Sequence, residues 1–187
     1  PGGPWKQVVS FPTVTFAIKT DNTLWSWGKN LNGLLGQGLK TQSLVPTKIS
    51  DEFFERLAVG SNSEHMLAIR TDGALFGWGS QDYGELGIYD STYVGYVNIP
   101  TLISTDLHVF AAVGRHTSFA IKTGGKLFVT GQNNRGQLGL KATTASINVF
   151  TEITSPLVSY DSVYSSGTIT LATTTNGTLL GTGFSAY

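Results

Sequence analysis

Histidines are the side chains in this sequence best suited to acid–base or metal chemistry. His65 and His116 lie 51 residues apart, and His108 stands alone. Because that interval equals the period of a repeat in the chain, we expect His65 and His116 at equivalent places in successive repeats, too far apart to share one metal ion or act on one substrate atom. The sequence therefore predicts a structural role for both, with the ring nitrogens hydrogen-bonded to backbone, and no metal site.

The carboxylates do not suggest a catalytic pair. Asp51, Glu52 and Glu55 fall in one polar stretch, and Asp82 and Glu85 in a short glycine-containing loop. General acid–base catalysis needs two groups whose surroundings push their pKa values apart. Neither stretch predicts a desolvated pocket, so we expect both sets on the solvated surface.

Other catalytic and cofactor motifs are missing. The sequence has no cysteine, which excludes disulfides, thiol catalysis and Cys-ligated zinc or iron–sulfur sites. The glycine-rich segment 33–38 lacks the dinucleotide-binding spacing and the Lys and Ser/Thr of a phosphate-binding loop. The sequence therefore predicts a protein that is not an enzyme and uses no cofactor.

A thirteen-residue segment occurs four times and must form the framework that positions the side chains discussed above. The copies read FAIKTDNTLWSWG, LAIRTDGALFGWG, FAIKTGGKLFVTG and LATTTNGTLLGTG, and they close at Gly28, Gly79, Gly131 and Gly183. Each copy places Asn, Asp or Gly pairs between two apolar runs, as in a tight β-hairpin. An isolated hairpin is marginal in water, so the copies must pack on one another. A period of 51 to 52 residues is typical of solenoids and propellers.

Another motif follows the first three hairpins. A polar residue, two variable residues and Gly-x-Leu-Gly occupy 30–36, 81–87 and 133–139. This pattern suits a tight loop with one buried leucine. Trp27 and Trp78 precede the first two closing glycines, whereas Thr130 and Thr182 stand at that position in the other two copies.

Together, the hairpin, the Gly-x-Leu-Gly loop and the histidine ahead of the hairpin resemble the repeat of the regulator of chromosome condensation family over nearly the whole chain. The resemblance implies an all-β fold, a partial β-propeller of about three and a half four-stranded blades, belonging to a seven-bladed ring. We expect one propeller portion over 1–187, the rest of the ring coming from the same polypeptide or a second chain. The expected repeats are 5–53, 54–106, 107–157 and a truncated 158–187.

The net charge of the chain does not favour binding to nucleic acid or to a membrane surface. Twelve basic residues balance twelve acidic ones, and the longest apolar runs are strand-sized. We therefore expect no nucleic-acid partner and no membrane insertion. We assign Trp25, Trp27 and Trp78 to the core, where burial of a large side chain stabilises by roughly 1.5 to 3 kcal/mol.

The predicted contact surface is the irregular segment 88–106. It carries Tyr89, Tyr93 and Tyr96, and tyrosine rings are enriched at protein interfaces. Propellers present variable loops on a rigid frame, so function is expected in such loops.

The resemblance implies a binding module, with nucleotide exchange on a small GTPase, chromatin binding, β-lactamase inhibition and protein contacts in larger chains or virions among the family's activities. Abundant Thr, Ser, Asn and Gly with only 13% charged residues resemble bacterial surface and phage tail proteins. We predict a non-enzymatic binding or structural module, a cell-surface adhesion or phage virion tail component that contacts protein or surface glycan, in an extracellular or virion setting. The alternative is a guanine-nucleotide exchange or chromatin-associated regulator of a small GTPase.

Overall fold

The computed structural model describes residues 3–39, 41–88, 95–141 and 144–183. Over these ranges the chain is built of strands and contains no helix. The strands are β1 (Trp5–Phe11), β2 (Val14–Lys19), β3 (Thr23–Gly28), β4 (Ser43–Leu57), β5 (Val59–Gly60), β6 (His65–Arg70), β7 (Leu75–Ser80), β8 (Tyr96–Ser104), β9 (His108–Val113), β10 (Thr117–Lys122), β11 (Lys126–Gln132), β12 (Ser146–Glu152), β13 (Tyr160–Ser165), β14 (Ile169–Thr174) and β15 (Leu179–Gly183).

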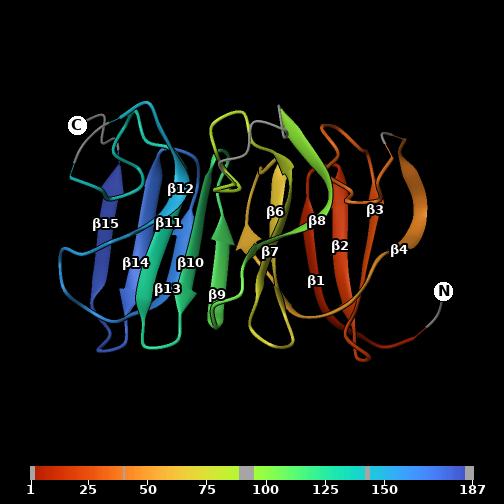
Figure 1. Cartoon of the computed structure of the whole chain (residues 1–187), viewed down its shortest axis with the longest axis horizontal. Coiled ribbons are helices and arrows are strands. Elements are labelled where there is room, and N and C mark those ends of the chain that lie inside the picture. Colours follow the sequence, from red (N-terminus) through yellow and green to blue (C-terminus); the bar gives the residue numbers. More distant parts are fainter. Residues whose placement is uncertain (1–2, 40, 89–94, 142–143, 184–187) are drawn as a thin grey trace.

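The strands form four antiparallel blades that lie side by side along the molecule (Figure 1). The long strand β4 belongs to two of them, because Lys48 pairs with β3 whereas Leu57 pairs with β6. Blade 1 is β1 to β3 with the start of β4, and blade 2 is the end of β4 with β6, β7 and β8. Blade 3 is β9 to β12, and blade 4 is β13 to β15. The predicted all-β partial propeller is confirmed, whereas the seven-bladed ring stays a prediction.

The repeated segment forms the hairpin at the centre of every blade. The turns join β2 to β3, β6 to β7, β10 to β11 and β14 to β15, and Figure 1 shows all four at the lower edge. Asn22 and Gly73 adopt positive φ, at 65° and 91°, as tight hairpin turns require. The Gly-x-Leu-Gly loops lie at the opposite, upper edge. We call these two edges the hairpin face and the loop face.

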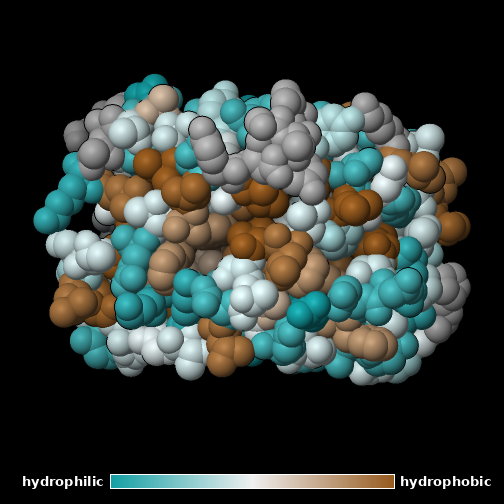
Figure 2. All heavy atoms as spheres, in the orientation of Figure 1, coloured by the Kyte–Doolittle hydropathy of each residue, from teal (hydrophilic) through white to brown (hydrophobic). Residues whose placement is uncertain are grey.

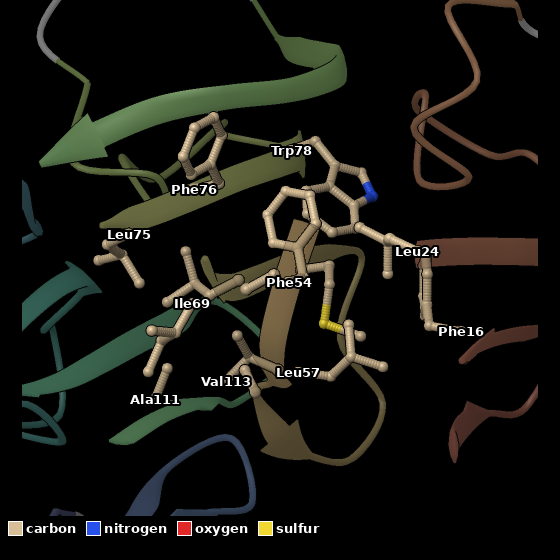
Figure 3. Packing of buried hydrophobic residues seen from close by; sticks show 14 of the residues in the cluster. Phe16, Leu24, Phe54, Leu57, Ile69, Leu75, Phe76, Trp78, Ala111 and Val113 are labelled. Carbon is tan, nitrogen blue, oxygen red and sulfur yellow. The ribbon is translucent and has the colours of Figure 1, made fainter. Parts of the chain in front are cut away.

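Apolar side chains from successive blades form the core. The larger cluster joins blades 1, 2 and 3, and a smaller one joins blades 3 and 4. Figure 3 shows Trp78 of blade 2 directed toward Phe16 and Leu24 of blade 1, and the rings of Trp78 and Phe16 lie 5.8 Å apart. On the surface, hydrophobic residues gather in a band across the middle of the view in Figure 2. Each blade therefore stabilises its neighbour by burying apolar surface.

The charged side chains of the hairpin face form ion pairs with one another or lie over aromatic rings. In three blades a cation at the end of the first hairpin strand lies over an aromatic ring of the second: Lys19 over Trp25 at 4.0 Å, Arg70 over Phe76 at 5.2 Å and Lys122 over Phe128 at 3.8 Å. Ion pairs join Lys6 to Glu55, Arg70 to Glu52 and Asp72, Lys122 to Asp106 and Lys126 to Glu152. Hydrogen bonds from Arg70 lower the pKa of Asp72 to about 2.

Candidate functional site

The predicted tyrosine contact surface is only partly visible. Tyr89 and Tyr93 lie outside the described residues, so their role stays a prediction. Tyr96 is half-buried at the start of β8, where it pairs with Ser80. Its ring lies against the loop of blade 1, because a Cβ added at Gly33 would fall 3.0 Å from Tyr96 Cδ2. Tyr96 therefore packs between neighbouring blades.

The four closing glycines and the tryptophans of the first two hairpins belong to the β-sheet framework. Gly28, Gly79, Gly131 and Gly183 all adopt positive φ, between 98° and 117°. Trp78 is fully buried. Trp27, at the same position of the first hairpin, is only half-buried and packs on Trp5, with 5.9 Å between the ring centroids. Trp25 is half-buried as well.

The expectation that His65 and His116 are equivalent is wrong. His65 is the first residue of β6 and pairs with the closing glycine Gly79. In blade 3 it is Thr117 that pairs with the closing glycine Gly131, so His116 lies one position earlier, outside the strand. Such a one-residue difference is enough to change which way a side chain faces.

His65 joins blades 2 and 3 through contacts with two serine side chains. Its Nδ1 lies 2.9 Å from Ser63 Oγ, and its Nε2 lies 2.7 Å from Ser118 Oγ on β10. The ring is fully buried, and this burial, with a smaller contribution from the charge of His116, lowers the pKa of His65 to about 3. His108 is structural too: Nδ1 lies 2.8 Å from the carbonyl oxygen of Asp106, and burial lowers the pKa of His108.

We expect His65 to make the protein less stable in mild acid. Its folded-state pKa lies below the ordinary value of 6.5, so the unfolded chain binds the proton first as the pH falls. Stability is complete above pH 6.5 and declines toward pH 3, with a loss of about 2 kcal/mol from this residue between pH 7 and pH 5. Urea unfolding at both pH values should show that His65→Gln removes this part of the loss. An unchanged pH dependence in His65→Gln would contradict the assignment.

A side-chain hydrogen bond that recurs in blades 2, 3 and 4 joins each of them to the Gly-x-Leu-Gly loop of the preceding blade. We call this contact the latch. Trp78 Nε1 donates to the carbonyl oxygen of Leu34 at 2.8 Å. Thr130 Oγ1 lies 2.8 Å from the Gly84 carbonyl oxygen and 2.8 Å from that of Ile147 in its own blade, so these two acceptors share its one hydroxyl hydrogen. Thr182 Oγ1 donates to the Gly136 carbonyl oxygen at 2.8 Å. Trp78, Thr130 and Thr182 all immediately precede a closing glycine. Threonine therefore replaces tryptophan without loss of this contact, which the sequence alone did not reveal.

We expect Thr130→Val to lower the free energy of unfolding by about 0.5 to 1.5 kcal/mol, because valine keeps the shape and removes the hydroxyl hydrogen bond, while the Gly84 carbonyl still accepts the Gly87 amide. Thr151→Val is the matched control, since Thr151 Oγ1 donates only to the exposed carbonyl of Val149 within its own strand. Urea unfolding of the two variants measures the difference. Equal effects would show that the latch adds nothing.

The loop face contains a polar cavity of about 540 Å³ to which blades 2, 3 and 4 contribute. Its lining is mostly polar and comes from segments far apart in sequence: Ser61, Asn62, Tyr83, Arg115, His116, Gln132, Ser166, Gly167 and Thr168. The loops after β5, β9 and β13 supply most of this lining. Because the propeller repeats, three equivalent loops converge at one place.

His116 lies in the cavity wall and is held there by Glu85. Glu85 is fully buried, which corrects its expected place on the solvated surface. Its Oε1 lies 3.1 Å from His116 Nδ1, and its Oε2 accepts the backbone N–H of Tyr83 at 2.8 Å. The rings of Tyr83 and His116 lie 4.6 Å apart. The His116 carbonyl accepts the Gln132 amide at 2.8 Å, which holds the loop to β11.

The groups that line the cavity are mostly hydrogen-bonding side chains. His116 has its carboxylate partner, yet the cavity is wide and polar rather than desolvated. Within the part of the chain that the structure describes, no group of three His, Asp or Glu residues could hold a metal ion. No helix long and apolar enough to cross a bilayer occurs among the described residues either.

Family models match the chain between residues 21 and 121. The regulator of chromosome condensation (RCC1) repeat matches residues 21–67 and 72–121, and a second model of the same description matches 57–85. The ultraviolet-B receptor UVR8 of Arabidopsis thaliana is 34% identical over 137 residues, which cover 72% of this chain and 31% of the relative. Mouse protein RCC2 is 31% identical over 121 residues, covering 65% and 21%.

Solved structures share the fold. Human WBSCR16 superposes with a TM-score of 0.83 at 22% identity, covering 98% of this chain and 48% of that one. Prp20p of Saccharomyces cerevisiae, described together with its binding to Gsp1p and histones, gives a TM-score of 0.85 at 18% identity, covering 98% and 46%. The chain thus spans less than half the length of each of these proteins. On the strength of the repeat matches, the chain belongs to the regulator of chromosome condensation (RCC1) repeat family.

Proposed function

We propose that this chain is a non-enzymatic docking module that holds a protein partner on its loop face. The observation that carries the proposal is the polar cavity of about 540 Å³, assembled from three blades, with His116 in its wall paired to the buried Glu85. Surface loops on a rigid frame are the usual place for recognition, and a concave site with a few convergent polar groups is the usual form.

The hairpin face is a poorer candidate. Most of its charged groups are engaged with one another, as in the pairs of Arg70 with Asp72 and Lys122 with Asp106. A partner would have to replace these contacts before gaining its own. By contrast, the loop face offers Arg115, which is exposed and makes no ion pair or hydrogen bond with the described residues.

Two narrower roles remain open within this proposal. The first is a cell-surface adhesion or virion tail component that contacts protein or surface glycan, supported by the low charge and the abundance of small polar residues. The second is a guanine-nucleotide exchange or chromatin-associated role, favoured by the fold shared with Prp20p, which binds Gsp1p and histones. The rest of the ring, from the same polypeptide or a second chain, belongs to either role.

Binding assays separate these roles. The chain is tested for binding to purified Gsp1p and histones, for acceleration of guanine-nucleotide release from purified small GTPases, and for saturable binding to intact bacterial cells before and after protease treatment. Accelerated release would establish the exchange role and overturn the adhesion role. Cell binding that protease abolishes would support adhesion through a protein, and cell binding that survives protease would point to glycan. Binding to none of these would overturn both roles.

A further inference from the structure

Arg115 is an uncompensated positive charge at the cavity. It is exposed and has no partner among the described residues, whereas most other Lys and Arg residues in the described ranges are paired or lie over aromatic rings. The first carbon of its side chain lies near the loop of blade 4, because a Cβ added at Gly167 would lie 3.9 Å from Arg115 Cβ. The other charged residue of the neighbouring loop, Glu64, is turned to blade 1, where Asn32 Nδ2 donates to it at 3.1 Å.

His116 presents one ring nitrogen to the same space. Nδ1 is occupied by Glu85 Oε1, and Nε2 makes no hydrogen bond with the described residues. Every buried side-chain nitrogen and oxygen among those residues has a partner, so Nε2 is reached by solvent. The contact with the Glu85 carboxylate holds the ring in place. The charge left for a ligand to match is that of Arg115.

Neutral hydrogen-bonding groups complete the lining. The side chains of Ser61, Asn62, Gln132 and Thr168 stand with Arg115 and His116 around the cavity. The ring of Tyr83 lies against His116 and gives the wall one flat apolar surface. A volume of about 540 Å³ suits one or two side chains of a partner.

We propose that this cavity binds a carboxylate side chain from an acidic segment of the partner protein. The inference rests on the proposed docking function and names the partner's chemistry at that site. The planar guanidinium of Arg115 matches a carboxylate in two parallel hydrogen bonds, and the hydroxyl and amide donors of the lining can bind its remaining lone pairs. A carboxylate carries the single negative charge that matches Arg115, whereas a phosphate group carries about −1.5 to −2 and the described lining offers no second Lys or Arg to match it. Because the chain is neutral overall, such binding would be local and not a general attraction.

The test uses a capped peptide of alternating Glu and Gly, its Gln counterpart and inorganic phosphate as probes on the full chain. Amide NMR titration at low salt should show saturable shifts with the Glu peptide around 61–62, 115–116 and 166–168, and none with the Gln peptide. Arg115→Gln should weaken binding about 10-fold or more, since a charged hydrogen bond is lost, and Arg115→Lys should weaken it less. Arg56→Gln, an exposed arginine on β4 outside the cavity, is the matched control.

Three outcomes would overturn the inference: no saturable binding of the Glu peptide, equal weakening by Arg115→Gln and Arg56→Gln, or stronger binding of phosphate than of the peptide. None of these outcomes contradicts the docking proposal, which is tested by the binding of a whole protein partner to other variants. If Tyr83→Ser or Thr168→Val weakens binding of a protein partner while Arg115→Gln does not, the loop face docks protein but not through a carboxylate. If none of these three variants weakens that binding, docking on this face fails as well.

Discussion

Replacing Gly131 with alanine is expected to lower the free energy of unfolding by about 4 kcal/mol, a large share of the stability of a typical domain. Gly131 closes the hairpin of blade 3 with a φ of 105°, a conformation that costs a residue with a side chain about 1 to 3 kcal/mol. The new Cβ would also lie 2.2 Å from the His116 carbonyl oxygen and 3.0 Å from Thr117 Cα. Both contacts are with backbone, so the strands must separate, at a further cost of about 1 to 3 kcal/mol.

Gly124→Ala is the matched control for this collision. Gly124 lies in the turn of the same hairpin with a φ of 90°, and a Cβ there would meet nothing within 4 Å. We expect the free energy of unfolding of this variant to fall by only about 1 to 2 kcal/mol, which is the cost of placing a residue with a side chain at positive φ. Urea unfolding of both variants isolates the collision term. Equal losses would show that the close approach of Gly131 to His116 is not real.

The Gly131 substitution should also disturb the cavity. The Gln132 amide donates to the same His116 carbonyl, so displacing that carbonyl moves the residue that pairs with Glu85. Loss of partner binding in Gly131→Ala under conditions where the protein is still folded would follow from this coupling.

Trp78→Ala should cost about 3 to 5 kcal/mol, because the side chain is fully buried and its loss leaves a cavity between blades 1 and 2. The indole packs on Phe16 and donates to the Leu34 carbonyl oxygen. Trp27→Ala is the matched control at the same position of the first hairpin, where the side chain is half-buried. Its expected cost is about 1 to 2 kcal/mol.

Trp78→Thr separates packing from the latch. Threonine stands at this position in blades 3 and 4 and donates to the preceding loop there. We expect a loss smaller than that of Trp78→Ala, since the hydroxyl can donate to the Gly33 carbonyl oxygen, the counterpart of Gly84 and Gly136. Thermal unfolding that ranks Trp27→Ala as costly as Trp78→Ala would contradict the role given to contacts between blades.

The frame was predictable because its signals are local. Asn and Gly in the turns, apolar flanks and a closing glycine specify each hairpin, and the constant period makes the hairpins stack. The buried Trp78 follows from the same pattern. The exchange of Trp for Thr at 130 and 182 was visible in the sequence, but only the structure shows that both reach the same kind of carbonyl acceptor.

The site was not predictable, since it depends on contacts between blades. His65 and His116 looked equivalent because their interval matches the period to within one residue, yet the loop before β6 is longer than the loop before β10. Glu85 has the surroundings of a surface loop in sequence and becomes buried only when blade 3 covers it. The cavity needs loops from three blades, and no single repeat contains a sign of it.

Hydrogen–deuterium exchange on the chain with and without a bound protein partner, Gsp1p or a cell-surface protein found in the binding assays, tests the central claim most directly. Docking on the loop face predicts protection at 61–64, 81–84, 114–117 and 165–168, with the hairpin turns at 71–74, 123–125 and 175–178 unchanged. Protection confined to the hairpin turns, with the loops around Arg115 and His116 exchanging as in the free chain, would contradict it.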